Sequence, residues 1–174
     1  MPAPSRLRRL DTLVDMPLYR ISRLLAEAGS LVVRVCEGRF GITRREWRLM
    51  SYLALSGGVP PSELARCAGL DKARTSRVIA SLLEKRLIVR TPKPSDRRQA
   101  IVQLTEEGRR IHDEVLPLTR RINQELLAVL SDDEVDWLDG VLDRLQARAE
   151  TVVATFDAEL PRARRHVGGA RRPV

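Results

Sequence analysis

The sequence predicts a mainly α-helical fold with one small β-hairpin. Apolar residues recur at helical spacing through most of the chain, and only residues 88–104 change to short β-branched runs separated by a turn-rich stretch. Six of the 174 residues are aromatic. The core must therefore consist of Leu, Val, Ile and Ala, which suits packed helices better than a β-sandwich. With 43% hydrophobic residues, the chain can bury the core of one domain with helical extensions.

The N-terminal part predicts an arm and one long helix. Residues 1–14 are basic and begin with prolines, so we expect them to form a flexible arm. Residues 15–42 are expected to form a dimerisation helix, because apolar side chains repeat at helical spacing over 18–36. Pro17 suits the first turn, where its missing N–H costs nothing. A helix with so wide an apolar stripe requires a partner surface.

Residues 43–104 predict three further helices and the hairpin. Thr43 and Glu46 have the spacing of a capping box, which marks the start of the first of these helices. A short helix closes at Gly69, and Asp71 caps the next one. One face of the helix after Asp71 is apolar and carries Thr75, Val78, Ile79, Leu82 and Leu83.

The opposite face of this helix is small and basic near its N-terminal end. It carries Lys72, Ala73, Arg74, Ser76 and Arg77. The hairpin that follows is expected to have two short strands, residues 88–91 and 100–104, joined by a basic turn with Arg97 outermost and Arg98 beside it.

Residues 105–158 predict two long C-terminal dimerisation helices. Thr105 caps the first of them, and Pro117 inside it predicts a kink. Ser131 begins a second capping box, which marks the start of the last amphipathic helix. Residues 159–174 are basic, and we expect them to form a disordered tail.

The net charge of +8 is unevenly distributed along the chain. Residues 60–103 hold ten basic and four acidic side chains, whereas residues 104–160 hold six basic and fourteen acidic ones. A basic block next to an acidic block indicates one face that attracts a polyanion and another that repels it. Ordinary solvated charge is the alternative interpretation, and charge alone does not separate the two.

Several function classes lack their signatures in this chain. No apolar run approaches the roughly 18 residues of a membrane span, and no signal-peptide segment is present, so we expect a cytoplasmic protein. No GxSxG, P-loop, HExxH or GxGxxG motif occurs, so we expect no enzyme. His112 and His166 are not spaced with a cysteine, so we expect no metal and no cofactor. Cys36 and Cys67 are expected to be small buried hydrophobes.

Two short helices, a basic-faced helix and a hairpin with an arginine tip follow one another in the order of a winged helix-turn-helix. A major groove about 12 Å wide admits one helix, and residues near the N-terminus of that helix reach base edges. Arg74 and Arg77 can each donate two hydrogen bonds to guanine. Ala73 leaves room for the backbone to come close to the duplex.

Phosphate and minor-groove contacts complete the predicted DNA-binding surface. Lys72 and Ser76 are suited to phosphate, and we assign Ser62, at the start of the preceding helix, to the same surface. Arg97 and Arg98 at the hairpin tip are placed to enter the adjacent minor groove, where negative potential is concentrated.

Three stretches of the chain resemble the MarR-type regulators. The third and fourth helices, the wing and the last helix of that family are similar to SELARCAGLDKARTSRVIASLLEKRLIVR, PSDRRQAIVQLTEEG and LSDDEVDWLDGVLDRL. The resemblance covers roughly residues 15–155, and its most specific part is Asp96-Arg97-Arg98 followed by Leu104-Thr105-x-x-Gly108. Arg86 stands where the family has the glycine that ends the recognition helix, and Pro60 replaces the usual capping residue of the third helix.

The resemblance implies a homodimer, a palindromic operator and repression relieved by a small ligand. The apolar stripes at both ends of the chain independently predict pairing with a second copy. Two-fold pairing would place two recognition helices about 34 Å apart, which predicts double-stranded DNA with a pseudo-palindromic site as the partner. A non-specific architectural DNA-binding protein is the alternative; it would share the basic patches without needing the long dimer helices.

An effector pocket is also implied by the resemblance. Tyr19, Arg20, Arg23 and Trp47 are its candidate residues. The arginines would pair with a carboxylate and the rings would stack on a small aromatic acid. The alternative places Trp47 in the core and the arginines in surface ion pairs.

Overall fold

The structure is a computed structural model that describes residues 5–67, 72–93, 96–157 and 159–161. The chain divides into two compact units, Met1–Leu126 and Leu127–Val174. The predicted helix-closing Gly69, the predicted cap Asp71 and most of the predicted tail lie outside the described residues.

The first unit begins with the predicted long helix. Two short 3-10 turns, η1 (Arg6–Arg8) and η2 (Leu13–Asp15), come before it, so the expected arm contains local structure. Helix α1 (Pro17–Val33) begins with its proline in the first turn, as predicted. It continues directly into a π-helical segment, η3 (Arg34–Arg39), and Gly41 then reverses the chain with φ of 63°.

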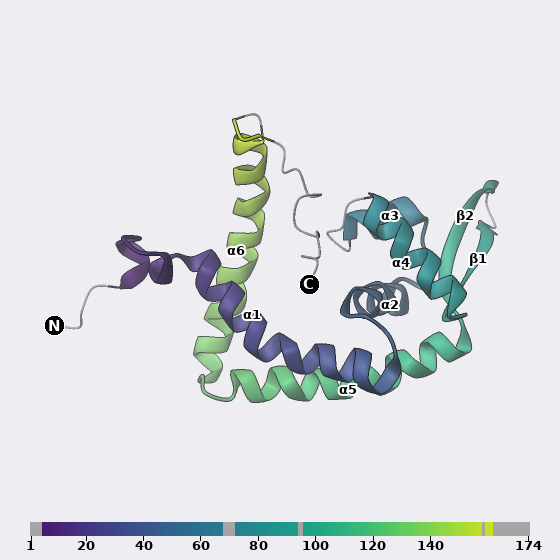
Figure 1. Cartoon of the computed structure of the whole chain (residues 1–174), viewed down its shortest axis with the longest axis horizontal. Helices are drawn as coiled ribbons and strands as arrows, with labels where there is room; N and C mark the ends of the chain where they lie inside the picture. Colours follow the sequence, from purple (N-terminus) through teal and green to yellow (C-terminus); the bar gives the residue numbers. More distant parts are fainter. Residues whose placement is uncertain (1–4, 68–71, 94–95, 158, 162–174) are drawn as a thin grey trace, which may run out of the picture. The chain divides into compact units, whose positions relative to one another are not determined.

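Three helices and the hairpin form a lobe around α2. The helices are α2 (Arg44–Ser56), α3 (Pro61–Cys67) and α4 (Lys72–Glu84). The hairpin pairs β1 (Ile88–Lys93) with β2 (Asp96–Leu104) in antiparallel register. In Figure 1, α2 lies between α3 and α4 on one side and α5 on the other.

The hairpin is connected to the rest of the lobe by a third short segment. The backbone of Val59 exchanges two hydrogen bonds with that of Val102, at 3.1 and 2.9 Å. Val102 itself is fully buried. The base of the wing is therefore held by backbone pairing as well as by apolar contacts, while the far end of the hairpin projects away from the helices (Figure 1).

Helix α5 (Glu106–Leu127) closes the core of the lobe and then runs alongside α1 (Figure 1). Thr105 caps it, as predicted, by accepting a hydrogen bond from the N–H of Gly108 at 3.0 Å. Pro117 lies inside the helix. The core consists of aliphatic side chains, as the composition predicted; its fully buried members include Leu49, Met50, Leu53, Leu64, Leu82, Ile88, Val102 and Val115.

The second unit consists of α6 (Asp132–Phe156) and the residues around it. Its predicted capping box is present, with Ser131 and Glu134 exchanging hydrogen bonds between side chains and backbone. No residue of α6 is buried. None of the described helices combines the length and the apolar character that crossing a bilayer requires.

Candidate DNA-binding surface

Helix α4 separates a buried apolar face from an exposed polar one, as predicted. Thr75 and Leu82 are at most 2% exposed, and Val78 and Ile79 are buried beside them. The exposed face carries Ala73, Ser76, Arg77 and Ala80. The helix is therefore anchored along one side and presents small and basic side chains on the other, which is the arrangement that a groove-binding helix needs.

The predicted DNA-contacting residues of α3 and α4 differ in their surroundings. Ser62 is exposed on α3, and Arg74 on α4 is half-buried. Arg77 is exposed, and its Nε donates a long hydrogen bond of 3.4 Å to the carbonyl of Ala73 one turn earlier, which aligns the side chain with the helix. The side chain of Lys72 lies outside the described part of the structure.

The strands of the wing are longer than predicted. Lys93 pairs with Asp96, so β2 already begins at Asp96 and the register shifts between Pro92 and Lys93. Arg97 and Arg98 consequently belong to β2, which corrects the prediction that they lie in the connecting turn. Their side chains are not among those described. In the register, both arginines fall within this shift, between the paired residues Asp96 and Ala100.

A tight joint connects the end of α4 to the wing. The N–H groups of Arg86 and Leu87 donate to the carbonyls of Leu83 and Leu82 at 2.9 and 3.0 Å. This pair of hydrogen bonds defines a Schellman motif, which requires a left-handed residue at the position of Arg86. Arg86 has φ of 57°, a conformation that costs a residue with a Cβ atom about 1–2 kcal/mol. The glycine expected here from the family resemblance thus has a physical reason, and this chain departs from it.

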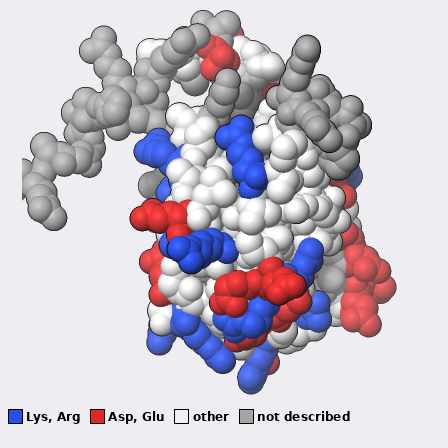
Figure 2. Space-filling view, turned by 90° about the vertical axis from the view of Figure 1, so that its right-hand side faces the viewer, with Lys and Arg blue, Asp and Glu red and all other residues white. Residues whose placement is uncertain are grey.

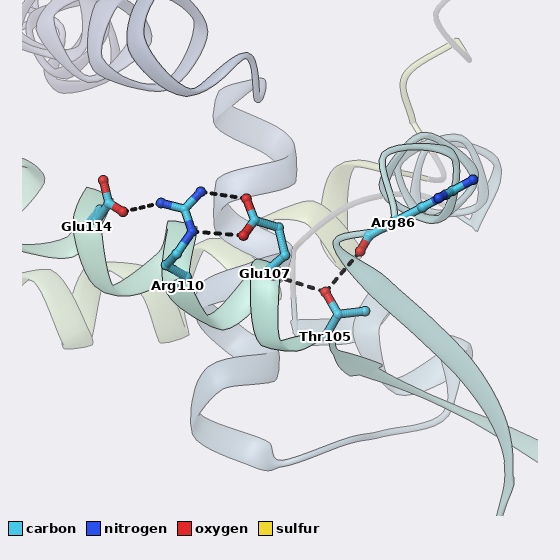
Figure 3. Close-up of polar contacts among 6 residues, drawn as sticks. Arg86, Thr105, Glu107, Arg110 and Glu114 are labelled. Carbon is cyan, nitrogen blue, oxygen red and sulfur yellow. Dashed lines mark hydrogen bonds and ion pairs between the residues drawn. The ribbon is translucent and has the colours of Figure 1, made fainter.

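The start of α5 closes the same joint (Figure 3). Thr105 donates its hydroxyl proton to the carbonyl of Arg86 at 2.9 Å and its N–H to the carbonyl of Leu87 at 3.0 Å. A Cβ atom on Gly108 would come within 2.0 Å of the Leu87 carbonyl oxygen. Only glycine fits this contact, which explains the Leu104-Thr105-x-x-Gly108 spacing noted in the sequence.

Acidic side chains gather beyond this joint. Arg110 on α5 forms ion pairs with Glu107 and Glu114, one turn before and after it (Figure 3). The hydrogen bond from Arg110 lowers the pKa of Glu107. Figure 2 views the molecule from the right-hand side of Figure 1 and shows acidic and basic side chains intermixed toward the lower end of that side. One arginine here is paired with two glutamates, so its positive charge is neutralised and negative charge remains. This end of the lobe is therefore less attractive to DNA phosphates than α4.

A buried carboxylate joins α2 to the C-terminal end of α4. Glu46 is 1% exposed. One of its oxygens accepts hydrogen bonds from the N–H of Thr43 at 2.6 Å and from Lys85 Nζ at 2.8 Å, and the other accepts from the Ser81 hydroxyl at 2.6 Å. Lys85 Nζ also donates to the carbonyl of Gly41 at 2.8 Å. We call these residues the Glu46 cluster.

The charge state of the Glu46 cluster follows from these contacts. Burial alone raises the pKa of Glu46, but the hydrogen bonds from Lys85, Ser81 and Thr43 outweigh it, so the pKa is lowered. The carboxylate is therefore ionised at neutral pH. The sequence indicated Glu46 only as part of a capping box, because its partners on α4 are remote along the chain.

An open cavity of about 720 Å³ lies between α1 and the first turn of α2. A second cavity, of about 270 Å³, lies between α1 and the end of α5, and Arg44 borders both. A Cβ atom on Gly29 would lie 3.1 Å from a terminal nitrogen of Arg44, so this guanidinium rests directly against α1. Apolar side chains form most of the remaining wall, among them Leu25, Ala26 and Val33 in the larger cavity and Ile21, Leu24 and Val32 in the smaller.

The four effector-pocket residues predicted from the sequence do not line either of these cavities. Arg20 and Arg23 are exposed on α1, and Tyr19 is half-buried. Trp47 stacks on His112 of α5, with ring centroids 5.1 Å apart, and packs against the core. The sequence missed Arg44, whose position against α1 depends on how α1 and α2 cross.

Cys36 is fully buried, as predicted, and burial raises the pKa of its thiol. Within the described residues, no group of three His, Cys, Asp or Glu side chains is placed to hold a metal ion. The side chain of Cys67 lies outside the described part of the structure.

Comparison with known proteins identifies the lobe. The sequence model of the MarR family matches residues 40–99, which run from the residue before Gly41 into β2. The chain belongs to the MarR family. MarR-family members are transcription regulators and not enzymes, and the lobe around α2 is their DNA-binding winged helix.

Three relatives illustrate the similarity within the MarR family. The multiple antibiotic resistance protein MarR of Salmonella typhimurium is 26% identical over 131 residues, 75% of this chain and 91% of the relative. A probable transcriptional regulator from Pseudomonas aeruginosa shares 30% identity, with a TM-score of 0.60 over 72% of this chain and 96% of that one. CouR from Rhodococcus jostii RHA1, solved bound to p-coumaroyl-CoA, shares 25% identity, with a TM-score of 0.70 over 78% and 94%.

Proposed function

We propose that this MarR-family protein binds a discrete DNA operator by inserting the exposed face of α4 into the major groove. The observation that carries the proposal is the division of α4 into a buried apolar face and an exposed face with Ala73, Ser76 and Arg77. Small residues allow close approach of the helix, and arginines recognise guanine through two hydrogen bonds. Arg97 and Arg98 on the wing supply the adjacent minor-groove contact.

The proposed regulator acts as a homodimer. Leu18 on α1 is 80% exposed, and its stripe continues through Ile21, Leu24, Leu25 and Leu31, each at least 43% exposed. On α6, Leu142, Leu145 and Val153 lie on one side of the helix and are each at least 50% exposed. Continuous apolar patches of this kind on a single chain mark protein interfaces. A two-fold dimer presents two copies of α4 about one duplex turn apart, roughly 34 Å, and so selects a pseudo-palindromic operator.

The proposed effector is a small aromatic acid that relieves repression. The cavities between α1, α2 and α5 combine apolar walls with the guanidinium of Arg44, which suits a ring bearing a carboxylate. CouR, which was solved bound to p-coumaroyl-CoA, supports an effector with an aromatic ring. Arg44 is a stronger candidate than Arg20 or Arg23, because it lines both cavities while the other two are exposed.

An operator footprint tests the DNA-binding part of the proposal. We expect protection of one discrete palindrome, whereas a non-specific architectural protein would protect DNA of any sequence evenly. Arg74→Ala and Arg77→Ala should each weaken operator binding by about 1–3 kcal/mol and relax base preference. Arg110→Gln removes the same charge within the acidic end of the lobe and should leave base preference unchanged. Equal losses on operator and random DNA would contradict base recognition by α4.

A thermal-shift screen against small aromatic acids tests the effector part. A ligand that binds only the folded protein raises its melting temperature. We expect an increase for the wild type and a smaller one for Arg44→Gln, while Arg23→Gln behaves like the wild type. If the ligand raised the melting temperature of Arg44→Gln as much as that of the wild type, the ligand would bind outside these cavities.

A further inference from the structure

The Glu46 cluster joins the wall of the larger cavity to the recognition helix α4. The cap residue Thr43 and the first two residues of α2, Arg44 and Arg45, line the cavity. Glu46 follows them directly, and its two carboxylate oxygens together contact Thr43, Ser81 of α4 and Lys85, the residue directly after α4. Lys85 also binds the carbonyl of Gly41, in the reversal between η3 and α2. The cluster thus connects the short stretch from Gly41 to Glu46 with the end of α4, which lies at least 35 positions further along the chain.

The stability of the lobe does not by itself account for a buried charge at this place. Taking a carboxylate and an ammonium group out of water is costly, and a well-packed apolar pair of similar volume often stabilises a protein equally well. The apolar side of α4, with Val78, Ile79 and Leu82, already anchors the helix to the core. A hydrogen-bonded charge differs from apolar packing in being directional, because its geometry tolerates little change in distance or angle.

Directional contacts at the end of α4 determine where its DNA-facing residues lie. Apolar packing fixes the depth of a helix in the lobe but allows small rotations and shifts along its axis. Ser81 on α4 and Lys85, directly after it, lie one turn apart, and both bind the same carboxylate. Two attachments to one point fix the rotation and the axial position together, and Arg77 lies one turn before Ser81 on the same helix.

We propose that Glu46 is a positioning residue for operator recognition, which holds α4 in the rotation and axial position that DNA bases require and ties that position to the cavity wall. This inference rests on the proposed role of α4 in reading an operator. Glu46 acts through Ser81 and Lys85 and does not touch DNA. Displacement of the first turn of α2 would therefore be passed to α4 through hydrogen bonds.

The variant Glu46→Gln separates this role from simple electrostatics. Glutamine also occupies the third position of capping boxes, so it keeps the contact with Thr43 while losing the ion pair with Lys85. Removal of a negative charge from the lobe would strengthen DNA binding if only net charge mattered. The positioning role requires the opposite result on the operator. Since no phosphate contact is lost, the dependence of affinity on salt concentration should keep its slope.

The experiment compares full-length wild type, Glu46→Gln and the control Glu114→Gln, which removes the same charge from the exposed surface of α5. Affinities for the footprinted operator and for an unrelated duplex are measured at several salt concentrations, with the active fraction of each preparation determined by titration. We expect Glu46→Gln to weaken operator binding by about tenfold and to leave the unrelated duplex and the salt slope unchanged. Glu114→Gln should leave the ratio of the two affinities unchanged.

Ser81→Ala provides a second, milder variant, because it removes one hydrogen bond and no charge. We expect a smaller loss of operator preference, and a loss in the double variant with Glu46→Gln that is less than the sum of the two single losses, since both changes weaken the same attachment of α4 to residue 46. An operator preference in Glu46→Gln and Ser81→Ala equal to that of the wild type would overturn the inference. A wild type that fails to distinguish the two duplexes would instead overturn the proposed operator recognition, so the two failures are distinguishable.

Discussion

The DNA-binding lobe and helix α1 are both rich in leucine, yet their leucines have very different surroundings. In the lobe, Leu49, Leu64 and Leu82 are completely buried. On α1, Leu18 is 80% exposed and Leu24 51% exposed. The lobe therefore completes its core within one chain, whereas the stripe of α1 stays largely exposed among the residues that the structure describes. The same residue type thus serves folding in one region and, in our proposal, assembly in the other.

The largest expected effect comes from emptying the core of the lobe. Leu82→Ala should lower the free energy of unfolding by about 2–5 kcal/mol, because it removes buried apolar surface and leaves a cavity. Denaturant unfolding followed at several protein concentrations measures this change. We expect the loss to be the same at every concentration, since Leu82 contacts only its own chain. A loss below 1 kcal/mol would contradict the close packing of α4 on the core.

The corresponding change on α1 should weaken the association of two chains and leave the stability of the lobe unchanged. Leu24→Ala should weaken the proposed dimer by about 1.5–3 kcal/mol for each leucine removed from the interface. Sedimentation equilibrium of the wild type and the variant measures the dissociation constant. Leu55→Ala is a matched control, because Leu55 is 89% exposed on α2 and lies outside the stripe. A wild type that stays monomeric at all accessible concentrations would remove the assembly role of α1.

A smaller effect, of opposite sign, is expected at the joint between α4 and the wing. Arg86→Gly should raise the free energy of unfolding by about 0.5–1 kcal/mol, because glycine avoids the cost of the left-handed conformation but loses more chain entropy on folding. Arg86→Ala should bring no gain, since alanine retains the Cβ atom. Thermal unfolding of the three proteins under identical conditions makes the comparison, and equal stabilities for Gly and Ala would show that the joint is unstrained.

The smallest expected effect is a dependence on acid. The folded protein holds the pKa of Glu46 below the ordinary value of 4.5, so the ionised carboxylate stabilises the fold at pH above that value. This contribution is lost as the pH falls through the lowered pKa of the folded state. The stability difference between wild type and Glu46→Gln should therefore be constant near neutral pH and shrink below about pH 4. A stability difference that grows on acidification would contradict the lowered pKa of Glu46.

Local signals explain which features could be predicted from the sequence. The capping boxes at Thr43 and Ser131 and the two faces of α4 depend on residues within one or two turns, and the structure confirms them. The strand register of the wing depends on pairing between two strands, which periodicity within one strand does not reveal. The sequence therefore predicted a longer turn than the structure has.

The unpredicted parts of the site depend on contacts between distant residues. Ser81 and Lys85 reach Glu46 across 35 and 39 positions of the chain. Arg44 borders both cavities only because α1 crosses the first turn of α2 at Gly29. Periodicity along one element carries no information about such crossings, which is why the sequence pointed to Arg20 and Arg23 instead.

Gly108 limits how this regulator can be re-engineered. Its backbone leaves no space beside the Leu87 carbonyl, so the end of α4, the wing and the start of α5 fit together as one rigid block. A hybrid regulator made by transplanting α4 alone would join it to the wing and the α5 of another protein, which do not fit the end of this α4. Retargeting to a new operator is better achieved by exchanging the whole segment from Thr43 to Gly108, or by changing only the exposed side chains of α4 in place.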